Sequence, residues 1–460
     1  MTDLIIIGAG PAGMAAAVEA VELGLAVTVL DENAEPGGQI YRNVERVAAA
    51  KSTVWDLLGD SYHHGLSLAQ AFRASAIDYK SGAMVWQVDR DGTVTYSRDG
   101  EVNSIGAKRI LIATGAMERA VPIPGWTLPG VMGAGAAQTL LKSGAMTPSG
   151  PVALAGSGPL LLLVAAQMLE AGADVSVVLE TTRFSDYLAA AAYLPGALRA
   201  APELRRGLAL RRAIRSRGVP IIGGVRHLRA EGGKSVSKVI YGTGSQEESF
   251  EISTLLLHEG VVPNVQISRH LRCDHEWFEP QRYWRPVIDE WGATSLENLA
   301  VAGDGGGING AKSAEAAGRL AALDAALRLD VINAHQRNRK ASSWRSMKRK
   351  NDALRPLLDR LFAPHKWVLR PPEPETVVCR CEEVTAGEIR DCVALGAMGP
   401  NQMKAFLRCG MGPCQGRICG LNVVETIAHA RAMTPPEIGY YRIRPPIKPV
   451  TLGELAAMDP

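Results

Sequence analysis

Short apolar runs alternate with glycine-rich turns over the first thirty residues of the chain. Residues 4–7 and 26–30 are apolar runs, and the longer stretch between them, residues 14–23, is rich in alanine. Apolar runs of about four to eight residues bounded by turn residues are typical of buried strands, whereas the longer stretch suits a helix. The pattern predicts a strand, a glycine turn, a helix and a second strand, which is how a doubly wound parallel sheet begins.

The same pattern occurs once more along the chain. An apolar run over residues 152–155 precedes Gly156-Ser157-Gly158-Pro159, a helix is expected to about residue 171, and residues 175–179 are apolar again. Two such units resemble the two-dinucleotide-binding flavoproteins, in which the FAD domain is split and its last piece follows the second unit. We therefore expect an α/β fold with two Rossmann-like domains and a small helical C-terminal domain.

A polar, basic stretch over residues 335–350 and prolines at 371, 372 and 374 precede a cysteine-rich segment. Such composition is typical of a break between domains. We expect five regions: residues 1–118 with 295–330 as a split FAD-binding domain, 119–294 as a second nucleotide-binding-like domain, 331–375 as a linker, 376–432 as a [2Fe–2S] domain, and 433–460 as a proline-rich tail.

The first glycine turn, Gly8-Ala-Gly10-Pro-Ala-Gly13, fits the G-x-G-x-x-G fingerprint. Its glycines permit a tight turn and close approach of the backbone to a pyrophosphate, and the N-terminus of the following helix favours the phosphate charge. Asp31 closes the second strand, where a carboxylate accepts hydrogen bonds from ribose hydroxyls. These features predict FAD as the bound dinucleotide.

Three further segments agree with this fingerprint: Gly37-Gly38-Gln39, Ala113-Thr114-Gly115 and Val301-Ala302-Gly303-Asp304. Together they look like the FAD-contact set of the glutathione-reductase-like superfamily. In that resemblance Asp304 would bond the ribityl or pyrophosphate region. The expected FAD contacts are Gly8, Gly10, Pro11, Ala12, Gly13, Asp31, Glu32, Gly38, Gln39, Ala113, Thr114, Gly115, Gly303 and Asp304.

The second glycine turn departs from the fingerprint. Gly156 and Gly158 occupy the first two glycine positions, but Leu161 stands at the third, where it holds the helix away from the strand. Glu180 follows the next strand, so a bound dinucleotide would be NADH rather than NADPH, whose extra phosphate would meet a carboxylate. A degenerate, structural unit and a structurally bound adenine nucleotide are the alternatives.

The distribution of cysteines along the chain distinguishes between classes of flavoprotein to which it could belong. No cysteine precedes Cys273. A pyridine-nucleotide disulfide reductase of this architecture needs a redox-active cysteine pair beside its flavin, because electrons leave the flavin through thiol chemistry. The chain is therefore not expected to reduce disulfides.

The other six cysteines share one short window, which points to a metal site. A Cys-x-Cys pair and a Cys-x4-Cys pair offer four thiolates from two loops, the number that an [2Fe–2S] cluster requires. A structural zinc site is the rival, although Cys-x-Cys is tight for it. Cys392 and Cys419 lie at apolar helices and are expected to be buried, with Cys419 as the substitute ligand. The expected ligands are Cys379, Cys381, Cys409 and Cys414.

Composition and charge limit the kinds of partner and the location that are expected for the chain. The net charge of +3 is small and dispersed, which argues against a nucleic-acid partner. The most apolar stretch, residues 152–169, is interrupted by glycines and a proline, so no transmembrane segment is expected. The N-terminus lacks the basic region of a signal peptide, which favours a cytoplasmic location. The histidines are scattered, and the sequence identifies no catalytic residue.

Several motifs carry a family resemblance along nearly the whole chain. The cysteine-rich module is similar to the bacterioferritin-associated-ferredoxin-like [2Fe–2S] domain. It follows an FAD domain with the motifs 113–119 and 122–132, and the chain closes with the motif 441–449. In this combination the chain resembles the family of opine oxidase A subunits, hydrogen cyanide synthase B subunits, and alpha subunits of proline and hydroxyproline dehydrogenases.

The resemblance implies an electron-transfer subunit of a dehydrogenase for opines, proline, hydroxyproline or glycine. The substrate would be oxidised on a D-amino-acid-dehydrogenase-like partner with its own FAD, and electrons would pass to a downstream acceptor, with the quinone pool as one option. It also leaves open an FMN at a subunit interface and peripheral association with the inner membrane through partners. The alternatives are a stand-alone NADH-dependent ferredoxin-type reductase and a cluster-bearing scaffold or redox sensor.

Overall fold

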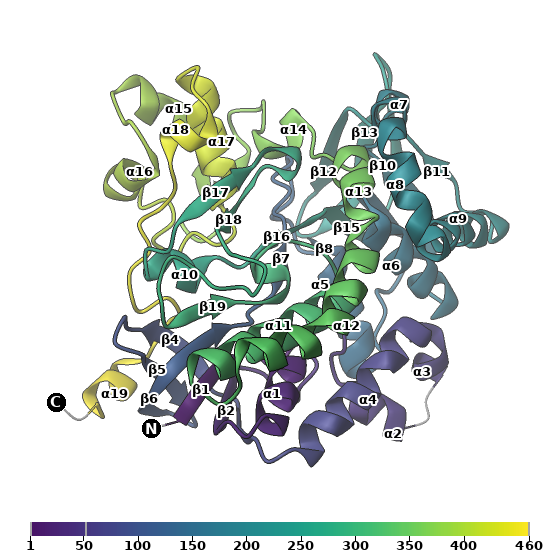
Figure 1. The fold of residues 1–460 in the computed structure, drawn as a ribbon. Helices are drawn as coiled ribbons and strands as arrows, with labels where there is room; N and C mark the ends of the chain where they lie inside the picture. Colours follow the sequence, from purple (N-terminus) through teal and green to yellow (C-terminus); the bar gives the residue numbers. More distant parts are fainter. Residues whose placement is uncertain (1, 51–52, 459–460) are drawn as a thin grey trace.

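The computed structural model describes residues 2–50 and 53–458, and Figure 1 shows its two main sheets side by side. The first sheet has the order β3-β2-β1-β6-β5-β4, and β19 pairs in parallel with β6 as well. Pairing is parallel from β3 to β6 and antiparallel from β6 to β4. The strands are β1 (Thr2–Ile7), β2 (Val27–Asp31), β3 (Asp78–Ser81), β4 (Met84–Val88), β5 (Thr93–Arg98), β6 (Glu101–Ile112) and β19 (Leu299–Val301).

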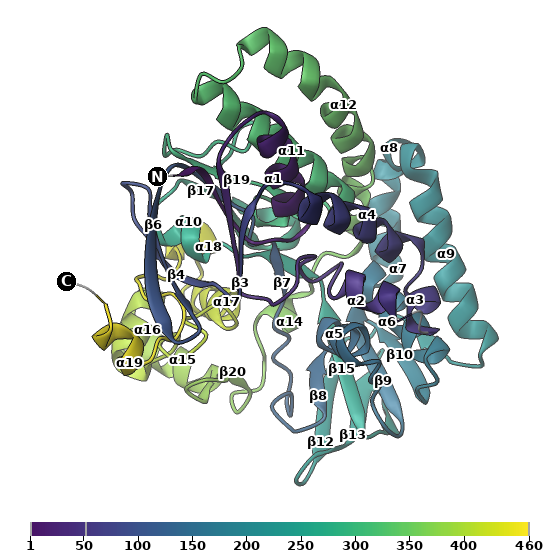
Figure 2. The same ribbon diagram turned by 90° about the horizontal axis from the view of Figure 1, so that it is seen from below.

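Helices cover this sheet because its central strands are apolar on both faces, as parallel strands require. Helix α11 packs on α1, and Figure 2 shows α12 outside α11. The approach of α11 is close, since a Cβ atom at Gly318 would lie 2.0 Å from the carbonyl oxygen of Ala12. The helices of this part are α1 (Pro11–Glu22), α2 (Val44–Ala49), α3 (Thr53–Leu58), α4 (Asp60–Ala74), α11 (Ala311–Arg328) and α12 (Ala334–Asp352).

The second sheet is fully parallel, with the order β11-β10-β9-β15-β8. An antiparallel meander of β12, β13 and β14 lies beside it. The strands are β8 (Val131–Gly133), β9 (Val152–Ser157), β10 (Val175–Glu180), β11 (Ile221–Ile222), β12 (His227–Gly232), β13 (Val236–Gly242), β14 (Glu247–Glu251) and β15 (Thr254–Glu259). Its helices are α5 (Ala134–Gly144), α6 (Pro159–Glu170), α7 (Phe184–Ala190), α8 (Leu194–Ala197) and α9 (Ala201–Ser216).

Two short antiparallel pairs, β7 with β16 and β17 with β18, lie between the two sheets and the C-terminal region. These strands are β7 (Ala116–Glu118), β16 (Val261–Pro263), β17 (His275–Phe278) and β18 (Tyr283–Pro286). The segment expected as a linker is largely helical, because α12 is followed by α13 (Arg355–Leu361) and α14 (Lys366–Leu369). Helix α10 (Gln266–His270) connects β16 to β17.

The C-terminal region packs on the first sheet through a shared apolar core. Ile5 and Ile7 of β1 belong to the same buried cluster as Cys379, Cys409 and the apolar face of α17. Its elements are β20 (Val377–Cys379), β21 (Val384–Thr385), α15 (Ala386–Ala394), α16 (Pro400–Leu407), α17 (Gly420–Ala430), α18 (Pro435–Ile438) and α19 (Leu452–Ala456).

The proline-rich tail returns to the first sheet. The amide of Ile447 donates to the carbonyl of Trp86 at 2.9 Å, and Lys448 Nζ lies 2.5 Å from Glu32 Oε2. Across the described residues, none of the helices combines the length and apolar character needed to cross a membrane.

Candidate functional site

Segments that are far apart in sequence meet at the N-terminus of α1. A Cβ atom added to Gly38 would lie 2.9 Å from the Cα of Gly10, and one added to Gly303 would lie 2.8 Å from the Cβ of Ala12. Both glycines have positive φ angles, +60° and +76°, which other residues rarely adopt. The structure therefore brings together three of the four segments that the sequence predicts around FAD, and the fourth adjoins them through Gly8, where a Cβ atom would lie 2.6 Å from the Ala113 carbonyl.

The glycines of the first turn have different roles. A Cβ atom at Gly13 would lie 1.8 Å from the carbonyl oxygen of Gly8, so Gly13 is required for the packing of α1 on β1. At Gly10 the nearest atom is the Cα of Gly38 at 3.9 Å, which leaves room beside the helix end. Helix α1 has no side-chain cap and no acidic residue in its first turn. Its first N–H groups and this open space fit the pyrophosphate of FAD.

Asp31 holds the first turn in place. Its Oδ2 accepts a hydrogen bond from the amide of Ala9 at 2.5 Å, and its Oδ1 accepts from the amide and side chain of Asn33 at 2.7 and 2.8 Å. Burial raises the pKa of Asp31, and these hydrogen bonds oppose the shift. The predicted contact of Asp31 with the ribose stays a prediction, as does that of Glu32.

Asp304 organises the loop that follows β19. Its Oδ1 accepts from the amides of Asn309 and Gly310 at 2.9 and 3.0 Å, just before α11 begins. Burial raises the pKa of Asp304, and the same two hydrogen bonds lower it. Between β6 and β7, the carbonyl of Gly115 accepts from the amide of Asn264 at 3.0 Å. The predicted Ala113-Thr114-Gly115 segment is thus joined to the chain that follows β16.

A buried lysine that the sequence did not single out fixes the Gly38-Gln39 loop. Lys142 Nζ, on α5, donates to the carbonyls of Gln39 and Ile40 at 3.1 and 3.0 Å and to Gln138 Oε1 at 3.0 Å. Burial lowers the pKa of Lys142 to about 7, and the positive charge of Arg42 lowers it further. Helix α5 of the second unit therefore supports a loop of the predicted FAD site.

In the second unit, side chains of the chain itself occupy the ends of the strands. Glu180 Oε1 accepts from Arg211 at 2.7 Å. Glu259 is buried and accepts from the hydroxyls of Ser157 and Thr181 at 2.9 and 2.7 Å. A Cβ atom at Gly156 would lie 1.7 Å from the carbonyl oxygen of His258, so this glycine is needed for strand packing.

Gly158 has more space, since its nearest neighbour would be the His258 ring at 4.0 Å. Leu161 is fully buried in the core. Binding of a nucleotide by Gly156, Gly158 and Glu180 stays a prediction.

Two histidines near the strand ends have structural partners. His258 Nδ1 lies 2.6 Å from Glu118 Oε1, and the same carboxylate accepts from the amide of Gly135 at the start of α5. His275 is held by Ser268 and by the carbonyl of Cys273, and burial lowers its pKa to about 3. Both histidines therefore have hydrogen-bond partners within the fold.

The cysteines of the C-terminal region form one group of thiols. The sulfur atoms of Cys379, Cys409 and Cys419 all lie within 4.8 Å of one another, and all three side chains are buried. Cys414 contacts Cys419, and Cys381 contacts Cys414. Hydrogen bonds from the thiols of Cys409 and Cys419 lower the pKa of Cys379 to about 2. The donor set fits a thiolate-ligated metal centre.

This arrangement contains the four predicted ligands and adds Cys419. The sequence placed Cys419 in the helix that follows the second pair, and burial was the preferred interpretation. The structure shows that its side chain is both buried and adjacent to three other thiols. The signal in the sequence was its position five residues after Cys414, which alone does not show that the helix start turns toward the other loop.

An aromatic residue of the C-terminal tail packs against the group of cysteine thiols. The hydroxyl of Tyr441 donates to Cys409 Sγ at 3.5 Å. Cβ atoms at Gly410 and Gly416 would lie 2.6 and 2.8 Å from the Tyr441 ring, and one at Gly412 would lie 2.3 Å from the Cβ of Cys381. The glycines of this loop are therefore required for the tail and the first cysteine pair to approach it.

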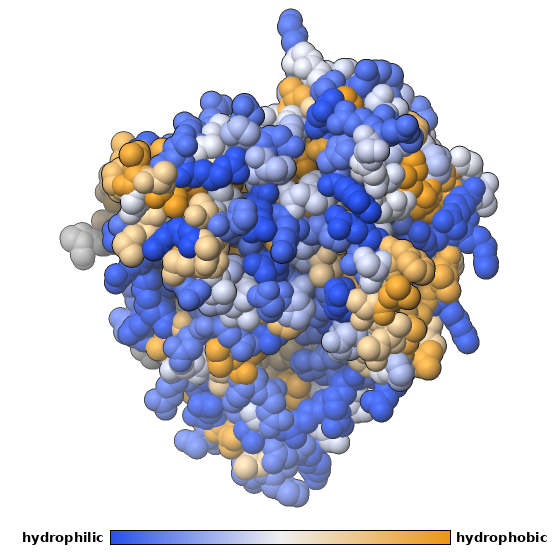
Figure 3. Space-filling view, turned by 90° about the horizontal axis from the view of Figure 1, so that it is seen from above, coloured by the Kyte–Doolittle hydropathy of each residue, from blue (hydrophilic) through white to orange (hydrophobic). Residues whose placement is uncertain are grey.

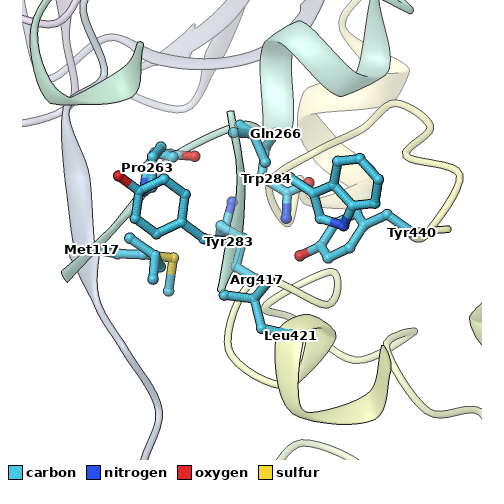
Figure 4. A pocket seen from close by; sticks show the side chains of 11 residues that line it. Met117, Pro263, Gln266, Tyr283, Trp284, Arg417, Leu421 and Tyr440 are labelled. Carbon is cyan, nitrogen blue, oxygen red and sulfur yellow. The ribbon is translucent and has the colours of Figure 1, made fainter. Parts of the chain in front are cut away.

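A small pocket of about 20 Å³ lies between the chain that follows β16 and the C-terminal region (Figure 4). On one side it is lined by the chain after β16, which reaches Gln266, and on the other by Arg417 of the cysteine loop and by Tyr440. The Oε1 of Gln266 and the Nε1 of Trp284 are buried without a hydrogen-bond partner among the described residues. No sequence pattern indicates this junction, because its walls come from distant segments.

Comparison with known proteins agrees with this architecture. The profile of the pyridine nucleotide-disulphide oxidoreductase family matches residues 2–319, and that of the sarcosine oxidase A3 domain matches residues 373–459. The chain is 43% identical to the opine oxidase A subunit of Agrobacterium tumefaciens (strain Ach5), over 99% of this chain and 91% of that protein. The chain belongs to the family of opine oxidase A subunits.

Further relatives extend this family. The HcnB subunit of hydrogen cyanide synthase from Pseudomonas aeruginosa is 32% identical over 97% of this chain and 96% of that protein. The crystal structure of L-proline dehydrogenase from P. horikoshii superposes with a TM-score of 0.72 at 20% identity, over 99% of this chain and 79% of that chain, which shows a common fold. The family resemblance and the fold class predicted from the motifs are confirmed, and the chain is an oxidoreductase.

The open space at Gly10 allows a test of the FAD site. Gly10→Ala adds a methyl group where the nearest protein atom is 3.9 Å away, so the chain should fold, but the methyl group would meet the pyrophosphate. We expect wild-type thermal stability without added FAD and purified protein that has lost most of its flavin absorbance. Gly196→Ala, at an exposed position with open space, is the control. Stoichiometric flavin in Gly10→Ala would show that the pyrophosphate lies elsewhere.

The buried lysine allows a test by pH. Below its folded pKa of about 7, Lys142 is charged in the core at a cost, and the cost is relieved as pH rises from about 7 toward the unfolded value of 10.5. Relative to Lys142→Met, the free energy of unfolding of the wild type should rise by up to about 1.4 kcal/mol per pH unit in this window. Urea unfolding at several pH values measures it, with Lys340→Met on exposed α12 as control. Parallel curves for wild type and Lys142→Met would contradict this assignment.

Proposed function

We propose that this chain is the FAD- and [2Fe–2S]-carrying electron-transfer subunit of a heteromeric, flavin-dependent dehydrogenase. The complex would oxidise a C–N bond of a small amino acid or secondary amine of the opine, proline, hydroxyproline or glycine class. The relatives are named as subunits of opine oxidase, hydrogen cyanide synthase and sarcosine oxidase, which supports membership of a heteromeric complex. The partner would be a D-amino-acid-dehydrogenase-like subunit with its own FAD.

The shared core between the first sheet and the thiol group carries this proposal. Strand β1 leads directly into the predicted FAD turn, and its side chains Ile5 and Ile7 pack in the same buried cluster as Cys379 and Cys409. Two sites that share one core stay at a fixed separation, as electron transfer between them requires. A flavin takes up electrons in pairs and an [2Fe–2S] centre carries one at a time, so a chain with both would convert two-electron oxidation to one-electron transfer.

The chain has no cysteine pair that could take electrons from the flavin by a different route. All seven cysteines are free, and Cys273, which alone lies outside the C-terminal group, is buried in the shared core. The second unit offers little support for the stand-alone NADH reductase, because Glu180 is paired with Arg211 and the neighbouring strand ends are filled by the Glu259 network. The proposed acceptor is a downstream carrier such as the quinone pool, and the proposed location is the cytoplasm, with peripheral association with the inner membrane through partners.

For the cluster we propose Cys379, Cys381, Cys409 and Cys414 as ligands, with structural zinc as the alternative metal. The role of these chain residues is to hold the metal centre at the edge of the shared core, and the Tyr441 hydroxyl would donate a hydrogen bond to the sulfur of Cys409. Cys419 competes with Cys381 for the fourth place, because its thiol lies with those of Cys379 and Cys409, whereas Cys381 is exposed.

Serine variants decide the ligand set. Cys409→Ser and Cys381→Ser should remove iron and the visible absorbance of the cluster and leave bound FAD in place, whereas Cys419→Ser should keep both. Iron, acid-labile sulfide and flavin are measured in protein purified without oxygen, with Cys392→Ser as the matched control on α15. Loss of the cluster in Cys419→Ser and its retention in Cys381→Ser would show that Cys419, and not Cys381, is the fourth ligand. One zinc and no iron in the wild type would show that the cysteines bind structural zinc and not an iron–sulfur cluster.

The division of labour between subunits is tested by turnover. The purified chain alone should not oxidise proline, hydroxyproline, glycine, sarcosine or opines with a dye as acceptor, because neither the motifs nor the contacts of His258 and His275 point to an acid–base group for this chemistry. Co-expressed with a D-amino-acid-dehydrogenase-like partner, it should form a complex that oxidises one of them. Turnover by the chain alone at the rate of the complex would contradict the proposal, and rapid flavin bleaching by NADH would favour the stand-alone reductase.

A further inference from the structure

An exposed helical segment in the second unit is both apolar and basic. Residues 184–217, between β10 and β11, form α7, α8 and α9 with single turns of 3-10 helix between them, and we call this segment the basic apolar face. Several of its large apolar side chains are more than half exposed: Phe184 77%, Leu188 63%, Leu198 65% and Leu208 66%. Burying such side chains is favourable, so an exposed group of them marks an interaction surface.

Positive charge is concentrated on the same segment. It contains seven arginines and two carboxylates, and no lysine. Arg211 pairs with Glu180, and Arg206 donates to the hydroxyl of Ser61. Within the described ranges, the remaining five, Arg199, Arg205, Arg212, Arg215 and Arg217, have no ion pair and are exposed. Their charge is therefore available to an external partner.

On α9, apolar and basic side chains are neighbours on the helix surface. On α9, Arg205, Leu208 and Arg212 are three and four residues apart, so they project from neighbouring positions of one helix face. Figure 3 shows hydrophobic surface gathered on the right-hand side of the molecule, the side on which α7 to α9 lie in Figure 1, with hydrophilic surface along its border. The inner side of the segment is packed, since Leu204 contacts a small core with Ala190 and Leu357.

We propose that the basic apolar face binds the surface of an anionic lipid bilayer. Interfacial helices place Phe and Leu side chains at the boundary of the acyl chains while Lys or Arg side chains meet the lipid phosphates. The cytoplasmic leaflet carries negative charge, which complements the five unpaired arginines. The inference goes beyond the proposed function and does not depend on it, because it concerns where the chain docks rather than what it transfers.

The charge pattern favours lipid over a protein partner at this face. In a protein interface the apolar anchors lie at the centre, where charged residues are depleted, and charges are paired at the rim. On the basic apolar face, seven arginines outnumber the two carboxylates, Asp186 and Glu203, and five of the arginines are exposed without an ion pair beside the apolar side chains. The other exposed apolar group, with Leu395 and Phe406 near the thiol loop, differs in this respect, because Arg408 there is paired with Glu382.

The experiment is vesicle flotation of the full-length flavin-loaded chain, both alone and in the complex with any subunit that co-purifies. Vesicles of phosphatidylcholine mixed with phosphatidylglycerol are compared with vesicles of phosphatidylcholine alone, at low and high salt. We expect binding to the anionic vesicles that decreases with salt. Each basic residue near an anionic surface contributes about fivefold to partitioning, so Arg205→Gln with Arg212→Gln should weaken binding by roughly 25-fold.

A second pair of variants tests the apolar contribution. Phe184→Ser with Leu188→Ser should weaken vesicle binding by at least about tenfold, because both side chains lose apolar area that the bilayer would bury. Arg349→Gln with Lys350→Gln, on exposed α12, removes the same charge elsewhere and should leave binding within about twofold. Bound FAD and thermal stability should match the wild type in every variant.

Three results would overturn the proposal. The first is equal binding to neutral and anionic vesicles, or to neither. The second is vesicle binding that the Arg205→Gln, Arg212→Gln pair and the control pair reduce equally. The third is a co-purifying subunit that abolishes vesicle binding and whose association is weakened by the Phe184→Ser, Leu188→Ser pair, since the face would then be a protein interface.

Discussion

The fold rests on the close approach of backbone to backbone around the first turn of α1. Gly13 lets this helix lie against β1, and Gly318 lets α11 lie against α1, because a Cβ atom at either position would overlap a carbonyl oxygen. Only Gly10 leaves unfilled space at the same helix end. Gly13, which fixes the packing of α1 on β1, and Gly10, which leaves room for a ligand, therefore stand in one short motif, and this ties the proposed FAD site to the packing of α1 on the first sheet.

A second constraint joins the C-terminal region to this sheet. The apolar faces of β1, β4 and α17 and the buried cysteines share one core, and the tail returns to β4 and to Glu32 at the end of β2. The cysteine region is therefore not an independent module on a flexible linker. Its buried cysteines share a core with the strand that leads into the proposed FAD turn.

The sequence predicted those features that depend on the spacing of residues close together in the chain. Each of these features is contained in a few consecutive residues, so it can be recognised in the sequence alone. They are the turns at Gly8 and Gly156, the strands before them and the cysteine pairs. The family and the fold class followed from these motifs and are confirmed. The roles of Lys142, Cys419 and Tyr441 depend on contacts between segments distant in sequence, and no local pattern encodes such contacts.

Flavin and cluster are proposed to exchange electrons within this one chain. The most direct measurement is flash photoreduction of the flavin in the isolated, oxygen-free chain, with flavin and cluster absorbance followed separately. We expect that flavin absorbance recovers as the cluster is reduced, that the rate does not depend on protein concentration, and that Cys409→Ser removes this phase. A flavin that stays reduced while the cluster stays oxidised, or a rate that rises with protein concentration, would contradict electron exchange within the chain.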